Sequence, residues 1–217
     1  LNSKGFDAWW LDASEPDLHS NLDIGERKAR TTPTALGSSV EYFNSYPLAH
    51  SEGVYRGSRE TDPDKRVFIL SRAFFAGQQR AGAAFWSGDI VPRWDDLREQ
   101  ISGLVNASMA GAPNVSFDIG GFAPEQRYID QDPAHVPEWR ELSLRWFQHG
   151  AFVPVFRLHG QFPYREIWEL APDGTPEQES FVHYLKLRYA LLPYIYTLAG
   201  DTWQKDGTIL RTLALDF

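Results

Sequence analysis

Carboxylate, arginine and histidine side chains recur in this sequence at or just beyond the ends of short apolar or aromatic segments. Two carboxyl groups on either side of an anomeric carbon, one ionised and one protonated, can hydrolyse a glycosidic bond. An arginine beside one acid favours its ionised form, whereas an apolar aromatic wall beside the other favours its protonated form. The residues in these positions are Asp12, Arg72, Asp89, Asp118, Arg157 and His159.

Asp12 ends the first of these segments, residues 6–11, whose apolar and aromatic character predicts a buried strand of about six residues. Pro16 lacks an N–H and restricts the residues before it, so neither a strand nor a helix is expected to continue there. Asp12 could instead cap the following turn, a role for which Asp17, beyond the proline, is better placed. Three carboxylates close to this strand end, beside two tryptophans, exceed what a turn requires and favour an active-site role.

The composition excludes several classes of function. The 217 residues carry a net charge of -8, which disfavours nucleic acid as a partner, and they include no cysteine, which excludes disulfides, thiolate metal sites and cysteine nucleophiles. No apolar run reaches the roughly 18 residues that span a membrane. Aromatic residues make up 14% and include eight tryptophans, a composition that suits stacking on sugar rings as well as a large core. The chain begins at Leu1 without an initiator methionine, so we expect a piece of a longer protein.

The elements that would position these residues alternate between strands and helices. A helix is expected over 35–55, opened by Thr34 and interrupted at Pro47, and residues 94–110 show a helical apolar stripe. Further helices are expected over 137–150 and 177–203. The expected strands cover 6–11, 67–71, 83–86, 114–117, 152–156 and 209–217.

About five strand–helix repeats indicate a parallel sheet. No Gly-rich phosphate loop follows any strand, so an open nucleotide-binding sheet fits poorly. We therefore predict an α/β fold, the second part of a (β/α)8 barrel, whose catalytic residues would lie at the C-terminal ends of the strands. Residues 1–207 would form the partial barrel, and residues 208–217 would begin a C-terminal β-domain.

Other hydrolytic chemistries fit less well. No G-x-S-x-G motif supports a serine nucleophile. A metal site would need three or more converging ligands, and although Asp118 and His159 could join such a set, neither a metal nor a cofactor is expected.

Five ordered motifs resemble glycoside hydrolase family 31 over nearly the whole chain. Residues 10–16 resemble the family's nucleophile motif, an aspartate followed by two residues and then Glu-Pro. Residues 72–77 followed by 86–89 resemble the segment that ends in the acid/base aspartate. The other matching segments are 118–122, 145–152 leading to 157–159, and 191–196.

This resemblance implies roles for individual residues. Asp12 would be the nucleophile and Asp89 the acid/base of a retaining α-glycosidase, with their carboxyl groups roughly 5–5.5 Å apart. Arg72, Trp86, Asp118 and His159 would line the −1 subsite, and Trp10 would be a further substrate-binding residue. The partner would be an oligosaccharide.

The segment 12–15 after two tryptophans, together with residues 78–80 and 86–89, resembles bacterial α-xylosidases that act on xyloglucan oligosaccharides more than α-glucosidases. An α-glucosidase or a transglycosylase is the alternative within the family. An inactive carbohydrate-binding fragment is the alternative outside enzyme function, although binding alone would need neither Asp12 nor Asp89.

Overall fold

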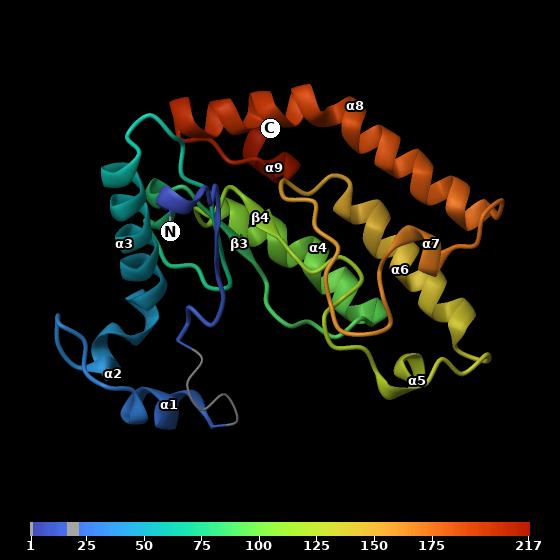
Figure 1. Ribbon diagram of the computed structural model, residues 1–217, viewed down its shortest axis with the longest axis horizontal. Helices are drawn as coiled ribbons and strands as arrows, with labels where there is room; N and C mark the ends of the chain where they lie inside the picture. The colour runs from blue at the N-terminus through green and yellow to red at the C-terminus, as the bar shows by residue number, and fades with distance from the viewer. Residues whose placement is uncertain (1, 17–21) are drawn as a thin grey trace. The chain divides into compact units, whose positions relative to one another are not determined.

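The computed structural model describes residues 2–16 and 22–217. The chain divides into two compact units, Leu1–Trp86 and Ser87–Phe217, whose elements are labelled in Figure 1. Asp17, the residue considered above as an alternative turn cap, lies outside the described residues.

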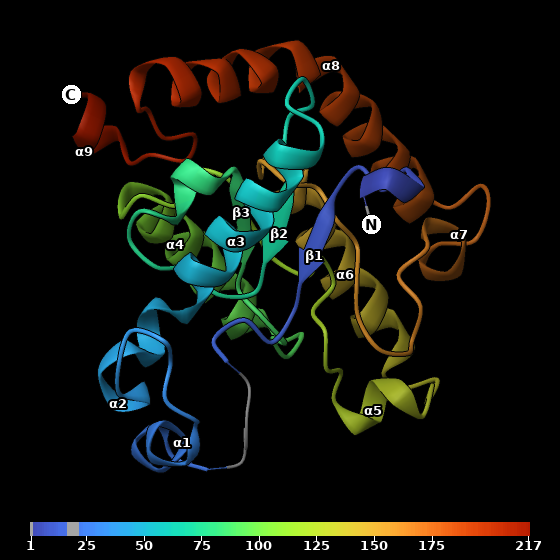
Figure 2. The same cartoon turned by 60° about the vertical axis from the view of Figure 1, so that its left-hand side comes forward.

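The first unit is built on three parallel strands, β1 (Trp9–Leu11), β2 (Ile69–Ser71) and β3 (Ala83–Trp86), which lie side by side in Figure 2. The register aligns Leu11 with Ser71 and Ser71 with Phe85. Because the strands are parallel, the residues that follow them meet at one edge of the sheet. This edge carries Asp12 and Arg72.

Helices cover this sheet. α3 (Tyr46–Thr61) packs against β2 and against the 3-10 helix η3 (Gln78–Ala81). Pro47 stands in the first turn of α3, where a missing N–H costs no helical hydrogen bond. The unit also contains η1 (Asn2–Lys4), α1 (Ile24–Arg30), α2 (Ser39–Tyr42) and η2 (Phe43–Ser45).

The second unit contains three long helices, α4 (Trp94–Met109), α6 (Val136–Gly150) and α8 (Pro176–Lys205), with α6 packed against both of the others. Its core is aromatic: ring centroids lie 5.3 Å apart for Phe117 and Trp146, and 5.0 Å apart for Phe147 and Phe181. The shorter elements are β4 (Val115–Ser116), α5 (Gln126–Ile129), α7 (Ile167–Leu170) and α9 (Leu213–Asp216).

Most expected elements are present, with shorter strands, but the expected strand over 152–156 is wrong. Pro154 has no N–H for a ladder, and the carbonyl groups of Ala151, Val153 and Pro154 accept hydrogen bonds from the guanidinium of Arg188 on α8. The chain becomes strand-like only at Leu158, in a parallel bridge to Ile119.

Two other expectations also differ from the structure. The single helix over 35–55 is wrong, because Ser38 rather than Thr34 caps α2 and the main helix begins only at Tyr46. The strand over 209–217 is wrong, because residues 213–216 are helical, and the Thr208 hydroxyl and the Leu210 N–H donate hydrogen bonds to Ser108 on α4. The domain limits at 207 and 208 stay a prediction. Among the described residues, no helix has the length and apolar character needed to cross a membrane.

Candidate active site

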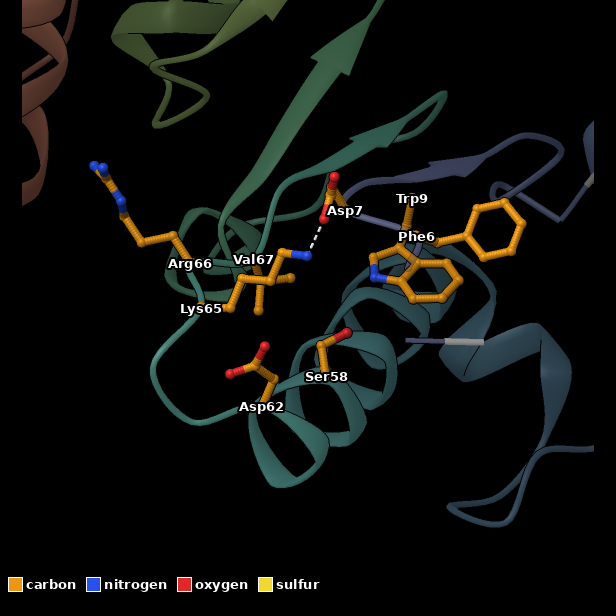
Figure 3. A pocket seen from close by; sticks show the side chains of 8 residues that line it. All are labelled: Phe6, Asp7, Trp9, Ser58, Asp62, Lys65, Arg66 and Val67. Carbon is orange, nitrogen blue, oxygen red and sulfur yellow. Dashed lines mark hydrogen bonds and ion pairs between the residues drawn. The ribbon is translucent and has the colours of Figure 1, made fainter. Parts of the chain in front are cut away.

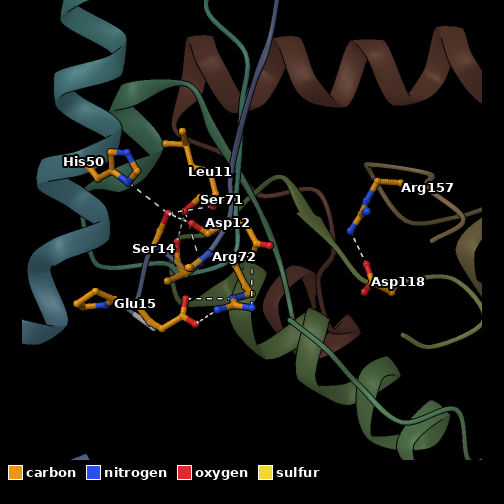
Figure 4. Close-up of polar contacts among 12 residues, drawn as sticks. Leu11, Asp12, Ser14, Glu15, His50, Ser71, Arg72, Asp118 and Arg157 are labelled. Atoms are coloured by element: carbon orange, nitrogen blue, oxygen red, sulfur yellow. Dashed lines mark hydrogen bonds and ion pairs between the residues drawn. The ribbon is translucent and has the colours of Figure 1, made fainter. Parts of the chain in front are cut away.

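Asp12 and Arg72 are neighbours because of the strand register. Leu11 and Ser71 are paired, so the next residue of each strand stands at the same level of the sheet edge, and the Arg72 N–H donates to the Leu11 carbonyl at 3.1 Å. Arg72 Nη1 lies 3.3 Å from Asp12 Oδ1. The expectation that an arginine accompanies one strand-end acid is therefore confirmed at this edge (Figure 4).

Arg72 holds a second carboxylate, that of Glu15. Its Nε donates to Glu15 Oε2 at 3.2 Å, and its Nη2 donates to Glu15 Oε1. The Arg72 side chain is only 12% exposed, whereas Glu15 is 31% and Asp12 is 49% exposed. The buried guanidinium is therefore fixed by its two hydrogen bonds to Glu15 and presents Nη1 to Asp12, whose carboxylate stays half open to a reactant.

The turn after β1 is fixed by short-range hydrogen bonds. Ser14 is buried, and its hydroxyl donates to the Leu11 carbonyl at 2.9 Å and lies 3.3 Å from Nδ1 of His50 on α3. Burial lowers the pKa of His50, which favours its neutral imidazole. Asp12 also accepts from the Ala13 N–H at 2.8 Å, so it serves the turn as well as pairing with Arg72.

Trp10 and Trp86 add an aromatic surface to the first unit. Their ring centroids are 6.0 Å apart with planes inclined at 45°, Trp86 being fully buried and Trp10 more than half exposed. An exposed indole supported by a buried one is the kind of platform on which the C–H face of a sugar can stack.

In the second unit, Asp118 is paired with Arg157. The Asp118 side chain is 1% exposed and accepts from Arg157 Nη2, as Figure 4 also shows. The two residues are brought together because the Ile119 N–H donates to the Arg157 carbonyl at 3.2 Å beside the bridge to Leu158. A carboxylate this well buried requires its cation.

Asp89 lies in an exposed bend of the second unit, on a loop anchored at several points. The Ile90 carbonyl accepts from the N–H groups of Phe122, at 2.8 Å, and Ala123. Gly121 has a φ of +68°, and a Cβ there would come within 2.8 Å of the Pro92 backbone, so the loop packs directly on this glycine. Arg93 Nε adds a 3.0 Å ion pair with Glu125.

His159 stacks on Phe122, with ring centroids 5.6 Å apart and an interplanar angle of 29°. The Phe122 carbonyl accepts from the Gln161 N–H at 2.8 Å. Phe122 therefore joins the loop of Asp89, the turn after Asp118 and the segment of His159.

The structure thus groups the predicted residues into two sets, one in each unit. Trp10, Asp12, Arg72 and Trp86 belong to the first unit, whereas Asp89, Asp118 and His159 belong to the second. Glu15 was not predicted as a site residue, and Arg157 was named only as a polar residue at a strand end, although each stands inside a motif that was singled out. The described residues contain no group of three or more His, Cys, Asp or Glu side chains able to hold a metal ion.

A pocket in the first unit lies at the opposite ends of the strands. Figure 3 shows it lined by residues before and at the start of β1 and β2, together with side chains of α3 and the loop that follows it. Lys65 ion-pairs with Asp7 there. Because Asp12 and Arg72 stand at the C-terminal strand ends, this pocket is not part of the candidate site. The lining residues are Phe6, Asp7, Trp9, Ser58, Asp62, Lys65, Arg66 and Val67.

Known proteins resemble this chain along its whole length. The model of the Glycosyl hydrolases family 31 TIM-barrel domain matches residues 1–198. An alpha-xylosidase of Saccharolobus solfataricus is 40% identical, over 98% of this chain and 28% of its own length. An alpha-glucosidase of the same organism is 32% identical, over 99% of this chain and 33% of its own length.

Solved structures of family 31 glycoside hydrolases are also similar to this chain. The GH31 alpha-xylosidase of Xanthomonas citri is 71% identical with a TM-score of 0.96, over 100% of this chain and 24% of that protein. A GH31 dextranase of Flavobacterium johnsoniae, complexed with glucose, is 30% identical with a TM-score of 0.83, over 99% of this chain and 26% of that protein.

The chain spans between 24% and 33% of the length of these relatives. The expected fold, part of a (β/α)8 barrel, is confirmed by the domain match together with the parallel strands and the helices around them. With the TIM-barrel domain matched over residues 1–198, the chain belongs to glycoside hydrolase family 31.

Proposed function

We propose that this chain supplies both catalytic carboxyl groups of a retaining α-glycoside hydrolase. The observation that carries the proposal is the Asp12 carboxylate at the C-terminal edge of a parallel sheet, half open to solvent and 3.3 Å from Nη1 of Arg72, whose other two nitrogens pair with Glu15. A carboxylate held in this way suits a nucleophile, which must be oriented toward the reacting carbon without being covered.

The reaction would proceed in two displacements. Asp12 attacks the anomeric carbon to form a β-glycosyl ester while Asp89, initially protonated, gives its proton to the leaving oxygen. Asp89 then takes a proton from water, and that water displaces Asp12 from the anomeric carbon. Two inversions restore the α configuration, and both carboxyl groups return to their starting states.

Five residues are proposed to form the sugar-binding site. The open indole of Trp10 offers a stacking surface, while the ion-paired groups of Arg72 and Asp118 are held ready for hydroxyl groups. Trp86 and His159 complete the set: the buried Trp86 acts by packing against the Trp10 indole, and His159 stacks on Phe122.

The proposed substrate is a non-reducing-end α-xyloside, such as a xyloglucan oligosaccharide. Its support is the residues flanking Asp12 and Asp89, together with the name alpha-xylosidase carried by relatives that are 40% and 71% identical. An α-glucosidase is the second candidate, favoured by the relative of that name at 32% identity. The two sugars differ by one CH₂OH group, a contact typically worth about 1–3 kcal/mol when apolar.

Covalent labelling tests the nucleophile. In the full-length protein, an activated glycosyl fluoride is expected to label Asp12, and Asp12→Ala should lower activity by several orders of magnitude. Asp7→Asn is the matched control, because Asp7 stands before the same strand at its opposite end. Labelling of any other acid would contradict the assignment.

Asp89 and the substrate class have separate tests. Asp89→Ala should slow substrates with poor leaving groups far more than activated aryl glycosides, and azide should rescue it by displacing Asp12 from the β-glycosyl ester to give an α-glycosyl azide. For the substrate class, kcat/KM for p-nitrophenyl α-xyloside should exceed that for the α-glucoside by about tenfold or more, equivalent to about 1.4 kcal/mol. A preference for the glucoside would favour the α-glucosidase and leave both carboxyl assignments intact.

A further inference from the structure

Arg165, which follows the segment 159–164, is a buried cation surrounded by backbone carbonyl groups. The residue is 5% exposed. Its Nη1 donates to the carbonyls of Gln161 and Pro163, and its Nη2 donates to the Gly121 carbonyl at 2.6 Å. The guanidinium also lies over the Trp139 ring, 5.0 Å from its centroid.

Burying this charge costs free energy that the carbonyl groups offset only in part. Burial lowers the pKa of Arg165 to about 10, opposed by the charges of Asp118 and Glu166. The side chain therefore stays charged near neutral pH. Because a planar guanidinium can bind several carbonyls at fixed angles, it ties two separate segments together in a way that an ammonium group cannot.

The segments that Arg165 joins are those that carry candidate site residues. One is the turn after Asp118, where a Cβ on Gly120 would come within 2.8 Å of Arg165 Cγ. The other is the segment that follows His159, where Gly160 likewise leaves space for the guanidinium. The arginine fills the room that these glycines leave.

Arg165 and the two segments that it joins form a clamp, and this clamp also reaches the loop of Asp89. Phe122 follows directly after the clamped Gly121, and its N–H holds the Ile90 carbonyl at 2.8 Å. Gly121 itself packs on Pro92. A change in this turn would therefore move the loop of Asp89, together with His159 through its stack on Phe122.

We propose that Arg165 is a positioning residue that sets the loop of Asp89 for proton transfer, acting through Gly121 and Phe122. This inference rests on the proposed role of Asp89. It assigns Arg165 no contact with substrate, and it predicts a loss that is much larger for substrates whose leaving group needs the acid.

The test compares Arg165→Met and Arg165→Lys with Arg188→Met in the full-length protein. Arg188 is the matched control, because it too is buried and donates to three backbone carbonyls, those of Ala151, Val153 and Pro154. Both methionine variants lose a buried guanidinium, so both should melt at lower temperature.

Kinetics and amide exchange separate the variants. In Arg165→Met, kcat/KM for alkyl glycosides should fall by about 100-fold, the effect of a displacement of about 1 Å, and by less than about threefold for dinitrophenyl glycosides. Arg165→Lys should show a smaller loss of kcat/KM with the same dependence on the leaving group. If Arg165→Met does not fold, Arg165→Lys is the variant that tests the proposal. The Phe122 and Gln161 amides should exchange at least about tenfold faster in Arg165→Met but unchanged in Arg188→Met.

An equal loss on all leaving groups, or unchanged exchange at Phe122, overturns the role of Arg165. A wild-type protein that hydrolyses no α-glycoside overturns the proposed function instead, and the exchange data then still decide whether the clamp exists.

Discussion

Replacing Glu15 by glutamine probes how the nucleophile is held. Glu15 accepts two hydrogen bonds from Arg72, whose third nitrogen faces Asp12. Glutamine keeps the shape of the side chain but offers one oxygen and an NH₂ group, which cannot accept from the guanidinium. Arg72 then loses one of its two hydrogen bonds to residue 15, its guanidinium rotates, and Asp12 loses its fixed orientation.

The size of the effect follows from burial. Hydrogen bonds to charged groups contribute about 1.5–3 kcal/mol, and the 31% exposure of Glu15 points to the lower part of that range for stability. A nucleophile displaced by a fraction of an ångström should cost about 10- to 100-fold in kcat/KM, equivalent to about 1.4–2.7 kcal/mol in the transition state.

The assay measures kcat/KM across glycosides with a range of leaving groups, and the rate at which an activated fluoride labels Asp12. Both should fall by the same factor, and the dependence on the leaving group should not change, because the acid is untouched. Glu52→Gln is the control, since Glu52 also pairs with an arginine, Arg80, but in an exposed pair of the same unit. Wild-type kinetics in Glu15→Gln, or an equal loss in Glu52→Gln, would refute the reasoning.

Two further predictions concern stability. Arg157→Met removes the ion pair with the 1%-exposed Asp118 carboxylate and should cost about 3–5 kcal/mol, whereas Arg98→Met, which removes an exposed pair, should cost less than about 1 kcal/mol. Equal shifts in thermal midpoint would contradict this. Burial lowers the pKa of His149 from 6.5, so the unfolded chain takes up a proton at a higher pH than the folded protein does, and stability falls as pH drops below about 6.5. The thermal midpoint of His149→Phe should therefore fall less than that of the wild type between about pH 7.5 and 5.5. An equal fall in both proteins would count against this prediction.

The sequence was most informative where local pattern and parallel topology agree. Asp12 and Arg72 each follow a short apolar run, and parallel strands bring such ends to one edge whatever the details of packing. The pairing of Glu15 with Arg72 depends on how the turn folds back across 57 positions, and no local pattern specifies it.

The features that the sequence did not predict also depend on contacts between residues that are far apart along the chain. Residues 152–156 have the apolar character of a strand, but the carbonyl groups of Val153 and Pro154 accept hydrogen bonds from Arg188, more than 30 positions away. Arg165 was hidden for a similar reason, because its partners at Gly121 become visible only in three dimensions. The one local signal was glycine, at 120, 121 and 160, where a Cβ would collide with neighbouring atoms.

The two proposed catalytic carboxyl groups are supported by different forces, and this difference makes the proposals separable. Asp12 is oriented by charge, through a guanidinium that is 12% exposed and therefore weakly screened by salt. The loop of Asp89 is held mainly by neutral backbone hydrogen bonds around Phe122, with one buried cation behind them. Weakening the first support should slow attack on every substrate alike, whereas weakening the second should slow mainly substrates whose leaving group needs a proton. The leaving-group dependence of kcat/KM therefore reports which support a substitution has disturbed, even where two variants lose the same total activity.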